Sequence, residues 1–126
     1  HLFNTTIREN IRIANKQASD EAIIASAQLA QVHDFIMSLP DGYDTYVGEN
    51  GVALSGGERQ RIALSRILLK DAPIWILDEM TANLDPLTAN DVMNAVMQAA
   101  EGRTIILMTH HLAFLEKYQF DQIITL

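Results

Sequence analysis

One stretch near the middle of the chain constrains the fold more than any other. Residues 54–85 have the sequence LSGGERQRIALSRILLKDAPIWILDEMTANLD. Ser55 and Glu58 have the spacing of a capping box, in which two side chains satisfy backbone N–H groups at the start of a helix. Apolar residues then recur at helical spacing as far as about Lys70. The stretch therefore predicts a helix whose N-cap is Ser55.

Gly56 and Gly57 stand in the first turn of this predicted helix, where capping does not explain them. Glycine in a helix costs up to about 1 kcal/mol relative to alanine, so the two positions indicate a need for space. A helix start offers unpaired N–H groups and the positive end of the helix dipole, and the missing Cβ atoms would let a phosphate approach closely. The alternative is an ordinary capped helix after a loop, and these residues taken alone favour it.

A short apolar run at residues 74–77 follows Pro73 and is typical of a parallel strand that is covered on both faces. Asp78 and Glu79 come directly after this run. Ligands of open α/β sheets bind at the carboxyl ends of the strands, so these acids are placed for a metal ion and a reacting water. Solvated acids at the end of a strand are the other interpretation, and the residues alone support the two about equally.

Further helices and strands alternate along the chain. We expect a helix within residues 1–14, capped by Asn4 or Thr5, helices at residues 20–30, 32–39, 85–102 and 113–118, and strands at residues 104–108 and 121–126. Asp85 and Pro86 suit the N-cap and first position of their helix. His110 and His111 follow a strand, and they lie beside the two acids if the strands are parallel. A histidine there can reach a phosphate or simply cap the strand.

Composition narrows the class of protein. The chain has 126 residues, of which 48% are hydrophobic, and this is enough for one core. A formal net charge of -7 argues against non-specific nucleic-acid binding, which depends on clustered Lys and Arg, and we expect no nucleic-acid partner. The absence of cysteine leaves the redox compartment open, and no apolar run approaches the ~20 residues of a membrane span. We expect one soluble unit, and its apolar first and last residues suggest a fragment of a longer protein.

The strings LSGGERQR, IWILDE and TANLD together resemble the signature motif, Walker B motif and D-loop of ATP-binding cassette (ABC) ATPases. LFNTTIRENI and TYVGENG are similar to the segment after the Q-loop and to the X-loop of exporter-type members, although Tyr46 replaces a usual acid. Met80 replaces the proline that usually follows the Walker B glutamate. The string GxxxxGK[ST] of a Walker A motif does not occur. The resemblance therefore covers the C-terminal portion of a nucleotide-binding domain.

This resemblance implies an α/β fold: a P-loop NTPase-like partial parallel sheet with a helical subdomain that carries the signature motif. The helical subdomain would take about residues 3–70, and residues 71–126 would form part of the ATPase core. The family's sheet order leaves a gap between the strand at 104–108 and the strand at 121–126. We expect unpaired backbone groups at that gap, which the isolated chain would close by re-pairing its strands or by pairing with another copy.

The resemblance also implies a role for each motif. Asp78 would hold Mg²⁺, Glu79 would polarise the attacking water, and His110, whose position matches the switch histidine, would contact the γ-phosphate of ATP. In a head-to-tail dimer, nucleotide held by the partner cassette would be bound by the signature and D-loop residues Ser55, Gly56, Gly57, Glu58 and Asp85.

ATP and Mg²⁺ are the implied cofactors, and the implied partners are a second nucleotide-binding domain and the transmembrane domains of a transporter. The resemblance places the full-length protein at the cytoplasmic face of a membrane, as an exporter ATPase, and we expect the isolated fragment to be inactive.

Two alternatives to the exporter ATPase stay open. The first is a soluble ABC-type ATPase of DNA repair or chromosome maintenance, against which LFNTTIRENI and TYVGENG count. The second is a non-catalytic helical interaction module.

Overall fold

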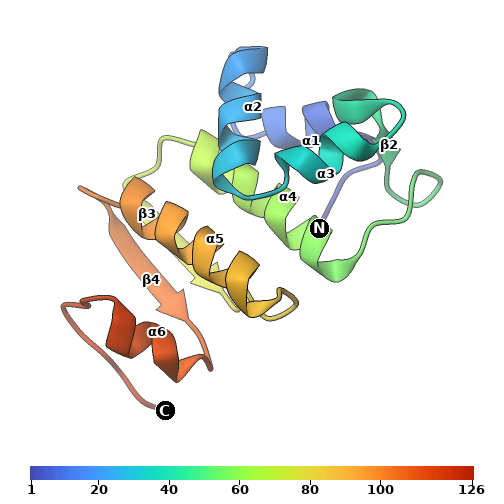
Figure 1. Cartoon of the computed structure of the whole chain (residues 1–126). Coiled ribbons are helices and arrows are strands. Elements are labelled where there is room, and N and C mark those ends of the chain that lie inside the picture. Colours follow the sequence, from blue (N-terminus) through green and yellow to red (C-terminus); the bar gives the residue numbers. More distant parts are fainter.

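In the computed structural model, which describes residues 1–126, the helices of the first half gather around one long helix, α4 (Gly56–Leu69). Figure 1 shows a second group, containing the parallel strands, on the other side of α4. No helix combines the length and the apolar character that crossing a bilayer requires. The first group comprises β1 (Thr5–Thr6), α1 (Ile7–Arg12), α2 (Asp20–Leu29), α3 (His33–Ser38), the 3-10 turn η1 (Gly42–Asp44) and β2 (Tyr46–Val47).

The capping box at the start of α4 forms as the sequence predicts. Ser55 Oγ accepts a hydrogen bond from the Glu58 backbone N–H at 3.2 Å, and Glu58 Oε2 accepts one from the Ser55 N–H at 2.7 Å. Ile62 and Leu64 are buried along the helix, so α4 contributes to the core. The predicted position and cap of this helix are therefore confirmed.

A buried polar contact ties the N-terminal segment to α4. Asn10 is fully buried on α1, and its Nδ2 donates to the carbonyls of Phe3 and Thr6 at 3.0 and 2.9 Å. Arg66 of α4 donates from Nε to the Asn10 carbonyl at 2.7 Å and from Nη2 to Asn10 Oδ1 at 2.5 Å. Burial lowers the pKa of Arg66. The first residues of the chain thus follow the position of α4.

Helix α1 begins later than the sequence predicts. Its N-cap is Thr6, whose Oγ1 accepts from the Glu9 N–H at 3.1 Å, and neither Asn4 nor Thr5 takes that place. The reason is tertiary: Thr5 and Thr6 form β1 and pair antiparallel with β2. Tyr46 of β2 strengthens this pairing, because its hydroxyl donates to the Asn4 carbonyl at 2.8 Å.

The second group is a βαβ unit in which α5 (Pro86–Ala99) connects β3 (Ile74–Asp78) to β4 (Thr104–Met108). The two strands are parallel, and Asp78 is paired with Met108. As predicted, Asp85 caps α5, accepting from the Thr88 N–H at 3.0 Å, and Pro86 follows it. The short helix α6 (Leu112–Lys117) comes after β4. The predicted parallel arrangement is confirmed.

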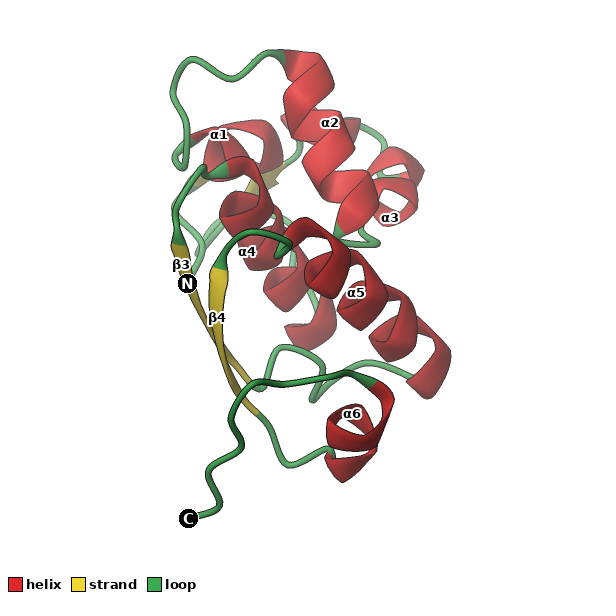
Figure 2. Ribbon diagram, turned by 90° about the vertical axis from the view of Figure 1, so that its left-hand side faces the viewer, coloured by secondary structure: helices red, strands yellow, loops and turns green.

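One face of this two-stranded sheet is open, which corrects the prediction of strands covered on both faces. Trp75 and Leu77 are 4% and 2% exposed, whereas Ile74 and Ile76 on the opposite face are 57% and 63% exposed. Figure 2 shows the helices on one side of the strands only. Since side chains alternate between the faces of a strand, β3 is half buried. We call the uncovered side of β3 and β4 the open face.

The strand predicted at residues 121–126 does not form. These residues are exposed and carry no regular structure, and β4 is hydrogen-bonded only to β3. A strand needs a neighbour to satisfy its backbone, and none lies beside this segment. Re-pairing within the chain therefore does not close the expected gap in the sheet.

Tyr43 gives a test of the packing in the first group. Its side chain is 5% exposed, its hydroxyl lies 2.7 Å from His33 Nδ1, and burial, opposed by the charge of Arg8, raises the pKa of Tyr43 to about 12. The unfolded chain loses this proton near pH 10, so the folded state holds more protons between pH 10 and pH 12. The free energy of unfolding should therefore fall over that range, and it should fall less steeply in Tyr43→Phe. Equal slopes in denaturant titrations would contradict this burial.

Candidate functional site

The carboxyl ends of β3 and β4 bring an acid and a histidine together. His110 Nε2 lies 3.5 Å from Glu79 Oε1, because the parallel register ends β3 and β4 side by side. His111 instead packs its ring against Phe114, with the ring centroids 5.4 Å apart. The imidazole of His110 is thus the one beside Glu79.

Asp78 and Glu79 differ in backbone conformation, although they are adjacent in the sequence. Asp78 is the last residue of β3 and, by the alternation along the strand, shares the open face with Ile74 and Ile76. Glu79 adopts a left-handed backbone conformation with φ of 45°, which is unfavourable for a residue with a Cβ. Its N–H donates to the Met108 carbonyl at 3.0 Å, so the turn stays attached to β4. Asp78 thus belongs to the strand, whereas Glu79 begins the loop that follows it.

The glycines of α4 lie against the loop that follows Glu79. A Cβ on Gly57 would lie 3.1 Å from the Asn83 carbonyl oxygen and 3.1 Å from Leu84 Cδ2. A Cβ on Gly56 would lie 3.1 Å from the Asn83 side-chain nitrogen. The chain's own loop therefore lies where these Cβ atoms would be, so the need for space at Gly56 and Gly57 has a cause within the chain, besides the phosphate that the sequence left as one of two interpretations. Asn83 carries no sequence signal that would have predicted this contact.

The residues predicted to bind the partner's nucleotide are divided between two elements. Ser55 and Glu58 bond to each other at the start of α4, beside Gly56 and Gly57. Asp85 lies at the end of the loop. Hydrogen bonds from the Thr88 hydroxyl, which has the larger effect, and from the Thr88 backbone N–H lower the pKa of the Asp85 carboxyl. The backbone of Gly57 lies close to Asn83 and Leu84, so the start of α4 and the loop are neighbours in the fold.

The donors at this site suit a metal ion that arrives with phosphate groups. No group of three or more His, Cys, Asp or Glu side chains in the chain is arranged to hold a metal ion. Mg²⁺ usually takes one or two carboxylates, keeps several waters and receives its other ligands from substrate phosphates. Asp78, exposed on the open face, could supply one such carboxylate. The residues present therefore fit Mg²⁺ bound together with a nucleotide, and do not form a closed metal cage.

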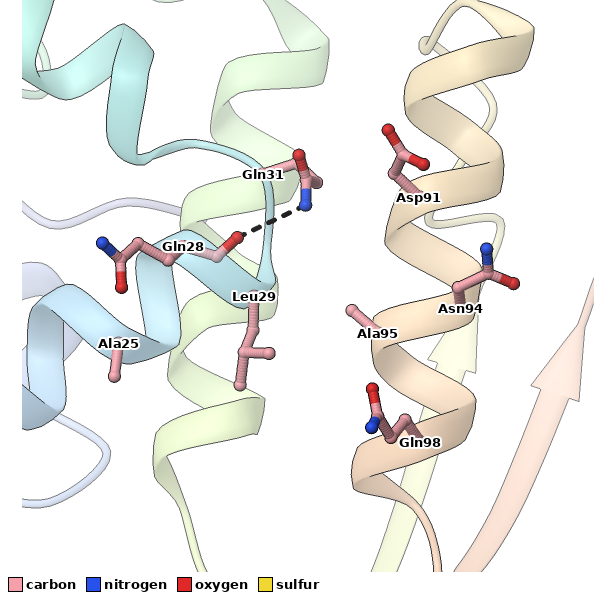
Figure 3. Close-up of a pocket in the computed structure, with 8 residues that line it drawn as sticks. All are labelled: Ala25, Gln28, Leu29, Gln31, Asp91, Asn94, Ala95 and Gln98. Atoms are coloured by element: carbon pink, nitrogen blue, oxygen red, sulfur yellow. Dashed lines mark hydrogen bonds between the residues drawn. The ribbon is translucent and has the colours of Figure 1, made fainter.

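Two surface cavities differ in their relation to these residues. A groove of about 550 Å³ between α2 and α5 is lined mainly by polar side chains, among them Gln28, Gln31, Asn94 and Gln98, and includes none of the predicted site residues (Figure 3). A larger cavity of about 830 Å³ lies between the N-terminal segment, the β2 loop and the start of α4, and Gly56 and Asn83 belong to its lining. Only the larger cavity adjoins the candidate site.

A parallel βαβ unit whose first strand ends in two consecutive acids, beside the glycine-rich start of a capped helix, defines an α/β domain of the nucleotide-binding class. A family model described as "ABC transporter" matches residues 1–82. The chain therefore belongs to the ABC transporter family.

The similar proteins carry names that refer to ATP. The chain is 55% identical over 116 residues to the "Glutathione/L-cysteine transport system ATP-binding/permease protein CydD" of Bacillus subtilis (strain 168), covering 92% of this chain and 20% of the relative. It is 53% identical over 112 residues to an "ATP-dependent lipid A-core flippase" of Legionella pneumophila (strain Paris), covering 89% of this chain and 19% of that protein. The chain thus spans about a fifth of the length of these relatives.

A solved structure agrees with the fold. The "Structure of a bacterial Atm1-family ABC exporter with ATP bound" matches with a TM-score of 0.83 and 45% sequence identity, and the match covers 90% of this chain and 20% of that one. The fold class inferred from the sequence, an α/β nucleotide-binding domain of the ABC exporter type, is therefore confirmed.

The contact between α4 and the loop predicts a difference between its two glycines. Gly57→Ala places a Cβ against a backbone oxygen, and such overpacking costs about 1–3 kcal/mol, against up to about 1 kcal/mol gained in helix propensity. Gly56→Ala is the matched control, since the Asn83 side chain that it meets can rotate away. Thermal unfolding of the intact protein should give a lower Tm for Gly57→Ala than for Gly56→Ala. The reverse order would contradict the contact.

Proposed function

We propose that this chain is part of the ATP-hydrolysing motor of an ABC exporter, with the helical subdomain at about residues 3–70 and part of the ATPase core at residues 71–126. The observation that carries the proposal is the pairing of Glu79 with His110, 3.5 Å apart at the carboxyl end of a parallel sheet. It is supported by relatives named as an ATP-dependent flippase and an ATP-binding/permease protein, and by an exporter structure with ATP bound.

In this proposal the reaction is attack of water on the γ-phosphorus of ATP, with cleavage of the bond to the bridging oxygen. Glu79 accepts a hydrogen bond from the attacking water and orients it, and His110 donates to a γ-phosphate oxygen as negative charge develops. Asp78 would hold Mg²⁺ directly or through water. The metal ion, when bound with ATP, would neutralise charge on the phosphate oxygens.

The other predicted residues would serve the nucleotide of a second cassette. Backbone N–H groups in the first turn of α4, at Gly56 and Gly57, would bind the γ-phosphate held by the partner on the side of the turn that Asn83 and Leu84 do not occupy. Ser55, Glu58 and Asp85 would complete this surface from the α4 cap and the end of the loop. A head-to-tail dimer of cassettes is therefore part of the proposal.

Transmembrane domains are the second proposed partner, at the cytoplasmic face of a membrane. The cavity of about 830 Å³ beside the N-terminal segment and the β2 loop offers a place for a segment of those domains. Tyr46, which replaces an acid there, is 47% exposed and bonds to the Asn4 carbonyl, so it stabilises the loop around this cavity.

The alternative of a DNA-repair or chromosome-maintenance ATPase is less well supported, because the relatives named above carry transport names and the net charge is -7. A purely helical interaction module would leave the acid and histidine at the strand ends without a role. We therefore retain the exporter motor as the proposed function.

Glu79→Gln tests the proposed chemistry in the full-length protein. The variant should keep ATP binding, and its turnover should fall by on the order of 10²-fold to 10³-fold. The reason is that a neutral amide is a weaker acceptor for the water's hydrogen bond than a carboxylate. Phosphate release and nucleotide affinity, measured side by side, would check this. Wild-type turnover in Glu79→Gln would exclude Glu79 from this role.

His110→Ala should slow hydrolysis more than His111→Ala, because His110 is the histidine beside Glu79. The opposite ranking would show that His111 has the role that we propose for His110.

A further prediction concerns the isolated chain. The sequence holds no Walker A string and the open face leaves apolar side chains such as Ile76 exposed, so the chain alone should neither bind MgATP tightly nor hydrolyse it. The unpaired edge of β4 should favour association with a second copy. Calorimetry with MgATP and light scattering would check both points. Micromolar binding by a monomer would contradict the prediction.

A further inference from the structure

Two residues other than glycine have a positive φ, and both are supported by neighbouring side chains of α4. These residues are Gln31, with φ of 59°, and Glu79, with φ of 45°. Gln60 Nε2 donates to the Glu79 carbonyl at 3.4 Å, and Arg61 Nη1 donates to the Gln31 carbonyl at 2.7 Å. Left-handed conformations of such residues persist only where the surroundings fix them. Consecutive residues of α4 thus brace two strained positions in different parts of the chain.

These two braced positions differ in their surroundings. Gln31 lies in the turn between α2 and α3, and Figure 3 shows its side chain beside the groove, turned toward the Gln28 carbonyl. Glu79 follows β3 and lies beside His110. The brace on Gln31 therefore supports the connection of two helices, whereas the brace on Glu79 acts on the residue whose carboxylate would orient water.

Gln60 is the one side chain that bonds to the Glu79 backbone. The remaining bonds of that backbone are made by main-chain groups: the Glu79 N–H donates to the Met108 carbonyl at 3.0 Å, and the Ala82 N–H donates to the Glu79 carbonyl at 3.1 Å. Each of these keeps Glu79 attached to the sheet or to its own loop. The bond from Gln60 is different, because it attaches Glu79 to the helix that carries the signature motif.

The amide of Gln60 makes little other use of its polarity. Its Oε1 is buried and has no hydrogen-bond partner, and a buried acceptor without a partner destabilises a fold. An apolar side chain of the same length would avoid this loss. A polar residue at this position is therefore explained by the one bond that it donates, to the Glu79 carbonyl.

We propose that Gln60 is a positioning residue for Glu79: it links the signature helix α4 to the strained Glu79 backbone, so that movement of α4 changes the placement of the Glu79 carboxylate. Binding of the partner's nucleotide at the start of α4 would in this way change the position of Glu79, which acts on the other nucleotide of the dimer. The inference rests on the proposed role of Glu79 in orienting water.

The test uses the full-length transporter and two substitutions that remove the donor. Gln60→Met keeps the length of the side chain, and Gln60→Glu keeps its shape and polarity, but neither an ionised carboxylate nor a thioether donates a hydrogen bond. Gln98→Met makes the same chemical change at an exposed position on α5 and is the matched control. Steady-state ATPase activity gives kcat and KM, and thermal unfolding gives Tm.

Both Gln60 variants should lower kcat by on the order of tenfold to a hundredfold, as small misplacements of a reacting group do. KM for ATP should stay within about twofold, since the residue does not bind nucleotide. Gln60→Met should unfold close to the wild-type Tm, because removal of the buried unpaired acceptor offsets the loss of the bond to the strained Glu79 backbone. Gln98→Met should match the wild type in all three quantities.

Other results would overturn the proposal. Wild-type kcat in either Gln60 variant would show that the donated bond is not needed, and a Tm of Gln60→Met that falls together with kcat would assign Gln60 a structural role only. Glu79→Gln, measured in parallel, distinguishes failure of this inference from failure of the proposed function. If Glu79→Gln loses turnover while Gln60→Met keeps it, only this inference fails. If Glu79→Gln keeps turnover, the proposed function itself fails.

Discussion

The close approach of the first turn of α4 to the loop at residues 79–85 is the contact on which the candidate site depends. A Cβ on Gly57 would lie 3.1 Å from the Asn83 carbonyl oxygen, so only glycine allows the loop its observed position without displacement. Glu79 begins this loop and Asp85 ends it as the cap of α5. The space left by a glycine therefore sets the position of an acid proposed for hydrolysis and of a residue proposed for nucleotide binding.

Helix α4 extends this dependence to the rest of the chain. At one end it holds the loop after β3, and further along it holds the N-terminal segment through the contacts of Arg66 with Asn10. By contrast, the open face of β3 and β4 carries exposed Ile74 and Ile76, which nothing in this chain covers. The helical group is thus well packed around α4, while the sheet presents an apolar surface. That difference agrees with a chain that spans a fifth of its relatives.

The features that the sequence predicted best depend on neighbouring residues along the chain. The α4 capping box and the Asp85 cap need partners only three positions away, so local pattern was enough. The first cap was placed too early because Thr5 pairs with β2, a contact over a long separation. Coverage of β3 and formation of a strand at residues 121–126 depend on neighbouring elements, which local pattern does not contain. The left-handed conformation of Glu79 could not be predicted either, because residues with a Cβ seldom adopt a positive φ.

Hydrogen exchange of the intact protein tests the central contact most directly. The Glu79, Ala82 and Leu84 amides donate to backbone carbonyls in the structure, at 3.0, 3.1 and 3.1 Å. If α4 fixes the loop, the peptide at residues 79–85 should be protected nearly as well as the peptide at residues 74–78 in β3. Exchange of the loop amides at the rate of an unstructured peptide, beside a protected β3, would contradict this account.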